Sequence, residues 1–153
     1  MCQSTQGQIM IDAIKSLTDT IINFLTEDPV RPHIAHSSRV GDHKDIFVYR
    51  DSEGKVGAVT CVSYQNTVPV DESELFELCD NPSIAVFYTI WSYAPGAGRT
   101  LIFDAVDYIK QNNTNITRFV TLSPTTQMAR KFHLKNNAII FRENHSSVNY
   151  EYV

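Results

Sequence analysis

A glycine-rich turn is the part of this sequence best suited to holding an anion. Gly96, Ala97 and Gly98 follow an apolar run and lead directly into a stretch with helical spacing that begins near Arg99 and Thr100. Backbone N–H groups at the start of a helix attract an anion together with the helix dipole, and glycines let the backbone approach a phosphate closely. The turn therefore predicts a phosphate-binding loop, although the two glycines could also serve only a tight strand-to-helix connection.

Two other nucleotide-binding motifs do not fit the same turn. A dinucleotide fingerprint requires a third glycine at the position of Leu101. A Walker A loop would require a glycine at Tyr93 and a lysine at Arg99. ATP and NAD are therefore disfavoured as ligands of this loop.

Ser123 and His133 are the side chains that could move protons. The imidazole of histidine has an unperturbed pKa near ~6.5, so it can donate or accept a proton close to neutral pH. Ser123 precedes Pro124 and could equally cap the helix that follows, and a single histidine on a helix is more often structural than catalytic. The residues alone leave both interpretations open.

The overall charge and composition disfavour several partners. The sequence has 13 basic and 17 acidic residues and a net charge of -4, whereas a duplex-binding protein usually needs a basic excess to neutralise phosphates. The local basic cluster of Arg130, Lys131 and Lys135 suits the phosphates of a coenzyme. No apolar run reaches the roughly 20 residues of a membrane span, and the polar N-terminus lacks a signal sequence. We therefore expect no nucleic acid or membrane partner and a cytoplasmic location.

Three histidines, His33, His36 and His43, share one polar loop. No cysteine or carboxylate with metal-ligand spacing accompanies them, and the three cysteines are scattered along the chain. We therefore expect a solvated loop and no metal cofactor.

The elements that must position these side chains follow from hydrophobic periodicity. Apolar residues at steps of three and four predict helices, and runs rich in β-branched and aromatic residues predict strands. The expected helices are 8–26, a short one near 72–79, 99–111 and 126–136, with Thr125 as the N-cap of the last and Asn137 closing it in the left-handed conformation. The expected strands are 46–49, 57–64, 84–91, 118–122, 138–142 and 147–153, and 30–44 is expected to be a loop.

The order of these elements predicts the fold class. A helix, a hairpin, a strand, a helix, a strand, a helix and two strands imply a mixed α/β sheet in a single domain over 1–153. The run 84–91 is apolar on both faces, which is typical of a central strand covered by helices on each side.

The chain resembles the GCN5-related N-acetyltransferase (GNAT) family in the order of its elements and in two motifs. The family's coenzyme A loop reads Arg/Gln-x-x-Gly-x-Gly/Ala, and residues 93–98 match both glycines but depart at the first position. The family's last helix often reads Ala-x-x-x-Tyr-x-x-x-Gly-Phe, and Ala129, His133, Asn137 and Ala138 fall at those spacings. The resemblance implies an α/β (α+β) fold with a mixed, mostly antiparallel sheet flanked by helices, the acyl-CoA N-acyltransferase fold.

The same resemblance implies a ligand and its contacts. Acetyl-CoA or another acyl-CoA would bind as co-substrate between the strands 84–91 and 118–122, with its pyrophosphate on the loop from Gly96 to Thr100. Backbone groups of Trp91 and Tyr93 would pair with the pantetheine arm where the two strands separate.

Three blocks, 121–124, 132–138 and 148–152, resemble the malonyl-CoA decarboxylase catalytic domain, which belongs to the same superfamily. In that family the serine of the Leu-Ser-Pro block and the histidine of the Phe-His-Leu block are the catalytic pair, which here would be Ser123 and His133. The decarboxylase separates these blocks by a long helical insertion and also has a helical N-terminal domain, and this sequence shows neither.

The resemblances imply an enzyme and leave three alternatives. An N-acetyltransferase would move an acetyl group from acetyl-CoA to an unidentified amine, with His133 protonating the departing thiolate in place of the family's tyrosine. A malonyl-CoA decarboxylase-like enzyme would use Ser123 and His133 to stabilise and protonate the thioester enolate. A non-catalytic coenzyme A-binding module is the third alternative.

The acceptor side has no motif of its own. The run 84–91 contains no carboxylate that could deprotonate an incoming ammonium, so the base would be water, Glu77 or Asp80. A homodimer could form if an exposed last strand ending at Val153 paired with a second copy.

Overall fold

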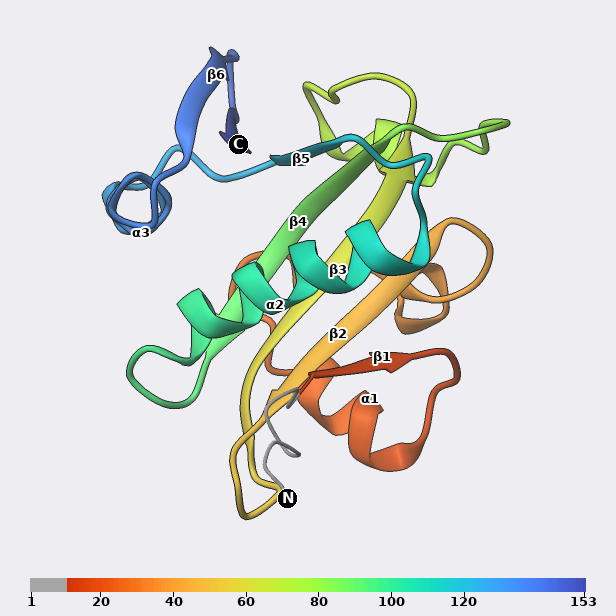
Figure 1. The fold of residues 1–153 in the computed structure, drawn as a ribbon, viewed down its shortest axis with the longest axis vertical. Helices are drawn as coiled ribbons and strands as arrows, with labels where there is room; N and C mark the ends of the chain where they lie inside the picture. Colours follow the sequence, from red (N-terminus) through yellow and green to blue (C-terminus); the bar gives the residue numbers. More distant parts are fainter. Residues whose placement is uncertain (1–10) are drawn as a thin grey trace.

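The computed structural model describes residues 11–153, which form one seven-stranded sheet (Figure 1). The strand order is β1-β2-β3-β4-β5-β7-β6, and every neighbouring pair is antiparallel except β4 and β5, which are parallel. The strands are β1 Ile11–Ile14, β2 Lys44–Arg50, β3 Val56–Gln65, β4 Ile84–Ser92, β5 Arg118–Thr121, β6 Ile139–Glu143 and β7 Val148–Tyr152. This mixed, mostly antiparallel sheet confirms the predicted fold class.

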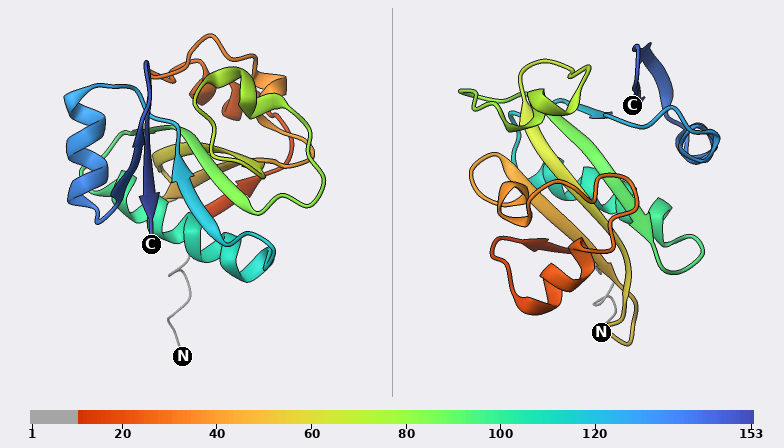
Figure 2. Two further views of the ribbon diagram at one scale, coloured as in Figure 1. Left: turned by 90° about the horizontal axis from the view of Figure 1, so that it is seen from above. Right: turned by 180° about the vertical axis from the view of Figure 1, so that it is seen from behind.

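Helical segments cover both faces of the sheet, and the view from above in Figure 2 shows the sheet between them. The helix α2 lies along one face, whereas α1 and the segments containing η1 and η2 lie on the other. The helices are α1 Asp19–Leu25, α2 Ala97–Asn112 and α3 Gln127–Lys135, and the 3₁₀ helices are η1 His36–Arg39 and η2 Glu72–Phe76. Among residues 11–153, no helix combines the length and the apolar composition needed to cross a bilayer.

Two apolar cores follow from this layering. On one face Leu101 of α2 packs in a cluster with Phe87 of β4, and on the other Leu25 of α1 packs in a cluster with Val86 of β4. Successive side chains of a strand point to opposite faces, so Val86 and Phe87 contribute to different cores. This explains why β4 is apolar on both faces and confirms the central strand predicted from the sequence.

The N-terminal segment differs from the helix predicted over 8–26. The first three residues of that range lie outside the described residues, and Ile11–Ile14 forms β1, which pairs antiparallel with β2. The helix begins only at Asp19, because the side chain of Thr18 accepts a hydrogen bond from the Ile21 N–H and caps it. Hydrogen bonding to the open edge of β2 therefore overrides the local helical spacing of β1.

The C-terminal helix α3 has a different cap from the predicted one. Thr126 rather than Thr125 is its N-cap, since the Thr126 hydroxyl accepts a hydrogen bond from the Ala129 N–H at 3.2 Å. Asn137 takes the predicted left-handed conformation, with a φ of 74°. The helix and the turn after it are otherwise placed as the sequence predicts.

The segment 30–44, predicted to be a loop, contains η1 and packs into the molecule. The side chain of Arg39 in η1 is completely buried, and its Nη1 lies 2.8 Å from Asp28 Oδ2. The other oxygen of Asp28 accepts a hydrogen bond from the Thr89 hydroxyl of β4 at 2.7 Å. This buried ion pair holds the residues after Asp28 beside β4.

The edge of the sheet is not where the sequence predicted it. The last strand, β7, lies between β5 and β6, so its pairing positions are already used within the chain. The edge strands are β1 and β6, and at the C-terminal end of the sheet Ile139 and Phe141 of β6 are exposed. At that end, a second copy would have to pair with β6 rather than with the strand that ends at Val153.

The strand β5 pairs with only the first part of β4. The pairing ends at Phe87 and Thr121, and Tyr88 is then an extra residue without a partner in β3. Such a β-bulge bends its strand, so β4 turns away from β5 beyond this point. The Arg31 guanidinium bridges the point of separation, because its Nε donates to the Tyr88 carbonyl oxygen at 2.7 Å and its Nη2 to that of Leu122 at 2.8 Å.

Candidate active site

The glycine turn starts α2 and leaves backbone donors unpaired. Gly96 is the N-cap and has a φ of 78°, a left-handed conformation that glycine adopts without strain. The Ala97 N–H donates to a carbonyl of the preceding turn at 3.2 Å, and the Thr100 N–H donates to Gly96 at 3.1 Å. Between them, the N–H groups of Gly98 and Arg99 have no acceptor within the described chain. These two donors are therefore available to an anion.

Gly98 also meets a steric requirement. A Cβ atom at Gly98 would lie 3.2 Å from the ring of Phe132 on α3. Such a contact is tight enough that the ring would have to move. The glycine therefore allows α2 to begin directly beside α3, in addition to exposing its N–H group.

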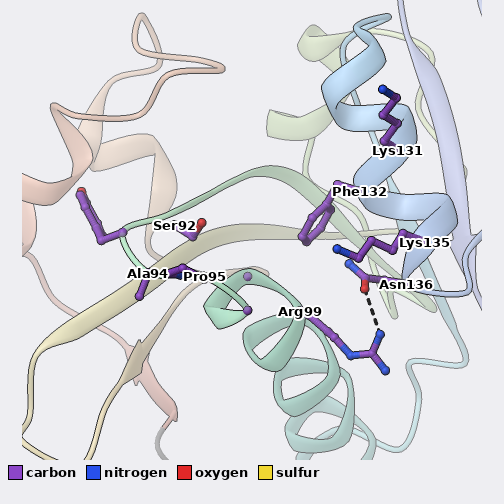
Figure 3. A pocket seen from close by; sticks show the side chains of 11 residues that line it. Ser92, Ala94, Pro95, Arg99, Lys131, Phe132, Lys135 and Asn136 are labelled. Carbon is purple, nitrogen blue, oxygen red and sulfur yellow. Dashed lines mark hydrogen bonds between the residues drawn. The ribbon is translucent and has the colours of Figure 1, made fainter.

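Cationic side chains of α2 and α3 line the cavity beside the start of α2 (Figure 3). Lys131 and Lys135, one turn apart on α3, and Arg99 of α2 line a cavity of about 540 Å³ in front of the loop. The Arg99 Nη1 donates to Asn136 Oδ1 at 3.2 Å, which ties the two helices together. Arg130, a member of the predicted basic cluster, lines a separate cavity. Arg99 thus takes its place beside the two lysines.

A second cavity continues from the first into the gap between β4 and β5. It holds about 570 Å³ and shares Ser92, Gly98 and Phe132 with the cavity in front of the loop. Ser123, directly after β5, and His133 of α3 also line it, although each is only 4% exposed. The two cavities therefore adjoin, and together they form a cleft with the phosphate loop at one end and the two side chains predicted to move protons at the other.

The structure brings Ser123 and His133 together and adds Tyr152 of β7. His133 Nε2 lies 3.3 Å from Ser123 Oγ, and His133 Nδ1 lies 2.7 Å from the Tyr152 hydroxyl. The Ser123 hydroxyl donates to Thr121 Oγ1 at 2.8 Å. Hydroxyl protons can rotate, so these contacts fit either neutral tautomer of His133. With Nδ1–H donating to Tyr152, the Nε2 lone pair faces Ser123 and can take a proton.

Burial determines the charge of His133. Desolvation lowers the pKa of His133 to about 4, because a buried imidazolium loses its hydration. The ring also stacks on Tyr150 with a centroid separation of 4.8 Å. The imidazole is therefore neutral at physiological pH and is held from both nitrogens and one face.

The arrangement of elements is that of several solved structures. Malonyl-CoA decarboxylase from Cupriavidus metallidurans superimposes with a TM-score of 0.72 at 14% identity, over 96% of this chain and 61% of that chain. The GNAT domain of S. lividans PAT superimposes with a TM-score of 0.65 at 10% identity, over 93% of this chain and 88% of that chain. The chain has the GNAT fold.

The extent of the GNAT likeness differs between the solved structures. The chain spans 60% of the malonyl-CoA decarboxylase from Rhodopseudomonas palustris, with a TM-score of 0.68 and 17% identity over 94% of this chain. It spans 98% of Tetrahymena GCN5, with a TM-score of 0.59 and 14% identity over 94% of this chain. No protein-family model and no curated protein matches the sequence. At these identities the likeness establishes the fold.

Within the GNAT fold, the backbones of Trp91 and Tyr93 are not the ones that face the gap. The Tyr93 N–H donates to the Gly57 carbonyl oxygen at 2.7 Å, and Trp91 lies two residues earlier in the same antiparallel ladder. Hydrogen bonds alternate along such a ladder, so Trp91 and Tyr93 direct their backbone groups towards β3. Ile90 and Ser92 direct theirs towards the gap. The backbones that face the gap are therefore those of Ile90 and Ser92 rather than those of Trp91 and Tyr93, and contact of any of them with a ligand stays a prediction.

Some of the residues predicted to contact the coenzyme line the cleft, whereas others only shape the start of α2. Those that line the two cavities are Trp91, Tyr93, Gly96, Gly98 and Arg99. Ala97 is buried, and the Thr100 hydroxyl donates to the Gly96 carbonyl oxygen at 3.2 Å. Ala97 and Thr100 thus shape the start of α2, and ligand contact by the residues that line the cleft stays a prediction.

The two carboxylates considered as bases lie at the wrong end of the sheet. The backbone oxygens of Glu77 and Asp80 accept hydrogen bonds from the side chains of Gln65 and Asn66. Gln65 pairs with Ile84 at the beginning of β4, whereas the cleft lies along its other end. The expectation that Glu77 or Asp80 serves the acceptor is therefore wrong.

The three loop histidines do not converge on one point. His33 Nε2 lies 2.7 Å from Glu72, His36 begins η1, and His43 forms the turn before β2 with a φ of 62°. Within the part of the chain that the structure describes, no group of three or more His, Cys, Asp or Glu side chains is arranged to hold a metal.

Tyr152 is the functional candidate that the residue types alone did not reveal. Tyr150 and Tyr152 alternate along β7 and so share one face of the sheet, where both meet His133. The sequence signal for Tyr152 was this two-residue spacing, within a block that resembles the malonyl-CoA decarboxylase domain. Only the structure shows that α3, which carries His133, is the helix that packs against this face.

Proposed function

We propose that this chain binds an acyl-coenzyme A and transfers its acyl group to an amine, as an acyl-CoA-dependent N-acyltransferase. The observation that carries the proposal is that the two cavities adjoin and share Ser92, Gly98 and Phe132. One end offers free N–H groups at the start of α2 with Lys131 and Lys135 beside them, and the other contains Ser123 and His133. An acyl-CoA has the same polarity, with an anionic pyrophosphate at one end and a thioester at the other.

The middle of the cleft suits the pantetheine arm. Backbone groups of Ile90 and Ser92 face the gap where β4 has left β5, and backbone donors and acceptors in such a place require partners. The amide groups of pantetheine would supply those partners in the manner of an added strand. The ligand would then replace the part of β5 that is missing from the sheet.

The chemistry of transfer requires one proton at the departing sulfur. The amine nitrogen forms a bond to the thioester carbonyl carbon, and the bond from that carbon to sulfur breaks. His133 would take on Nε2 the proton that the attacking nitrogen releases and would then give that proton to the sulfur, while Ser123 holds the imidazole in place. Acetyl-CoA is the donor we propose, with N-acetylation as the reaction.

Malonyl-CoA decarboxylation is the second candidate, and the direct contact of Ser123 with His133 favours it. In that reaction the bond between the carboxylate and the α-carbon breaks, and carbon dioxide leaves. The electron pair of the broken bond stays with the α-carbon and forms the thioester enolate. The hydroxyl and the Nε2–H would donate hydrogen bonds to the enolate oxygen, and the α-carbon would then take a proton that solvent supplies through His133. The thioester itself remains intact.

Binding is the first measurement, by calorimetric titration of the purified chain with coenzyme A, acetyl-CoA and malonyl-CoA. We expect micromolar affinity for the acyl-CoA forms. Absence of binding by all three would overturn the proposed function and with it the roles of Ser123 and His133.

Turnover then separates the alternatives. N-acetylation releases thiol from acetyl-CoA only when an acceptor amine is added, whereas decarboxylation releases carbon dioxide from malonyl-CoA with no acceptor and no free thiol. Binding without either product would instead assign the chain as a non-catalytic coenzyme A-binding module.

A further inference from the structure

The carboxylates beside the cleft are all occupied by other groups of the protein. Asp28 is 2% exposed and accepts from Arg39, Thr89 and two backbone N–H groups. Glu72 contacts the Arg31 Nη1 at 2.9 Å and His33 at 2.7 Å. These two carboxylates are therefore already paired with other groups of the protein.

Glu27 is the third carboxylate on this side, and it accepts a hydrogen bond from the Tyr93 hydroxyl. The same hydroxyl accepts from the Trp91 indole N–H at 2.9 Å. This chain of contacts ties Glu27 to Tyr93, and Glu27 lines neither of the two cavities. Its carboxylate thus supports Trp91 and Tyr93 rather than the reacting centre.

The cleft between β4 and β5 carries no charged side chain within the described residues. Apart from Ser123 and His133, its walls are mostly apolar, with Trp91, Leu122 and Phe132 among them. A cation that entered would lose hydration without gaining an ion pair, and this favours the neutral form of an amine. The walls also favour an acceptor with an apolar body.

Proton counting leads to the same conclusion. A neutral nitrogen that attacks the thioester releases one proton, and the departing sulfur takes one, so His133 can pass a single proton without any other base. An alkylammonium must lose a further proton before it can attack, and a base must receive it. The low basicity of the buried His133 imidazole matches the acidic proton that a weakly basic nitrogen carries after attack.

From these contacts we propose that the acceptor is an apolar molecule with a weakly basic nitrogen, such as an arylamine or an alkoxyamine, rather than an alkylammonium. The proposal rests on the N-acyltransferase function proposed above and names its substrate class. Among the described residues that line the cleft between β4 and β5, none is a carboxylate that could pair with an ammonium ion, so the cleft disfavours the ammonium form of the acceptor. The neutral form would pack against Trp91 and Phe132.

The test compares two acceptors of similar shape at neutral pH with saturating acetyl-CoA. O-Benzylhydroxylamine is neutral under these conditions, whereas benzylamine is an ammonium ion. We expect kcat/KM for O-benzylhydroxylamine to be at least about tenfold higher, measured by thiol release and by mass of the amide product. The uncatalysed reaction of each acceptor is subtracted.

The possible outcomes test the acceptor class separately from the proposed N-acyltransferase activity. A preference for benzylamine would overturn the acceptor class alone and leave the transferase in place. No amide from either acceptor, in a protein that binds acetyl-CoA, would overturn the transferase and the acceptor class together.

A carboxylate added to the cleft gives an independent check. Val30 is half-buried and lines the cleft on the side of the Asp28 segment, so Val30→Glu would place an acid there, and Val30→Gln is the matched uncharged control. We expect the Glu variant to lower the preference for O-benzylhydroxylamine about tenfold relative to the Gln variant. Equal preferences in the two variants would overturn the proposal that a missing carboxylate sets the acceptor class.

Discussion

At the scale of single residues, His133 is constrained more than any other member of the site. Tyr152 bonds one of its nitrogens, Ser123 lies at the other, and Tyr150 covers its ring. Such a group is oriented before any ligand binds, which is the condition under which a proton donor acts efficiently. The same constraints remove the imidazole from water and lower the pKa of His133.

Replacement of His133 should therefore separate binding from chemistry. We expect His133→Gln, which retains most of the side-chain volume, to lower turnover of an acyl-CoA by roughly 10²-fold or more. Affinity for coenzyme A should change little, because its proposed phosphate site lies at the start of α2. Calorimetry and thiol or carbon dioxide release measure the two quantities, and unchanged turnover in a folded variant would contradict the catalytic role.

His133 should also make the fold sensitive to acid. The pKa of His133 is about 4 in the folded chain and 6.5 when unperturbed. Between these two pH values the unfolded chain therefore binds a proton at His133 that the folded chain does not bind. Stability is thus full above pH 6.5 and is lost as the pH falls from 6.5 through about 4, by at most about 3 kcal/mol. Urea unfolding of the wild type and His133→Gln across this range measures the loss. A difference between them that does not vary with pH would contradict the prediction.

At the scale of elements, the site exists because one strand ends its pairing early. The bulge at Tyr88 turns β4 away from β5, and α2 begins at the far end of the same strand. The helix α3 then closes the opposite wall, bringing Lys135 and His133 to the two ends of one cleft. The helix α3 therefore contributes to both the phosphate end and the reacting end.

The start of α2 gives a prediction on coenzyme affinity. We expect Gly98→Asp to weaken coenzyme A binding at least about tenfold relative to Gly98→Ala, because its carboxylate would repel phosphate while remaining favourable to the helix N-terminus. Both variants have a Cβ, which would meet Phe132, so the alanine variant controls for displacement of that ring. Calorimetry checks the ratio, and equal affinities would contradict the phosphate loop.

The bridge at the separation of β4 and β5 gives a prediction on stability. Arg31 donates to one carbonyl on each side of the gap, and a lysine at this position cannot span both. We expect Arg31→Lys to lower the free energy of unfolding by about 2 kcal/mol. Arg50→Lys, at a more exposed ion pair with Asp12, should change it by less than about 0.5 kcal/mol. Equal effects in urea unfolding would show that the bridge contributes nothing specific.

At the scale of the whole molecule, one sheet separates two apolar cores, and the strands β4 and β5 of this sheet separate beyond Phe87 and Thr121. The larger α2 core lies on one face, the Asp28 and Arg39 segment packs on the other, and the cleft lies where β4 leaves β5. A ligand in that cleft would contact β4, α2 and α3 at once. Binding should therefore stabilise the folded chain as a unit.

Coenzyme A at a hundredfold excess over its dissociation constant should raise the free energy of unfolding by about 2.7 kcal/mol. Thermal or urea unfolding with and without the ligand measures this shift. Pantetheine at the same concentration should give a smaller shift, because it lacks the phosphates that the start of α2 would hold. Equal stabilisation by the two ligands would contradict the assignment of the phosphate end.

Local sequence determined the parts of this protein that depend on neighbours in the chain. The apolar run of β4, the glycine turn and the helical spacing of α2 are all set within a few residues, so periodicity and turn chemistry predicted them. The identity of Ser123 and His133 was also visible, as was the order of elements that implied the fold.

Tertiary structure alone decided the pairings between distant segments. Ile11–Ile14 has helical spacing but becomes β1, because the open edge of β2 offers backbone hydrogen bonds that no local pattern reports. The 3.3 Å contact of Ser123 with His133 and the choice of Ile90 and Ser92 as the backbone groups facing the gap depend in the same way on the path of the chain. Periodicity reports which side chains prefer burial, whereas the partner that buries them is set by the packing of the whole sheet.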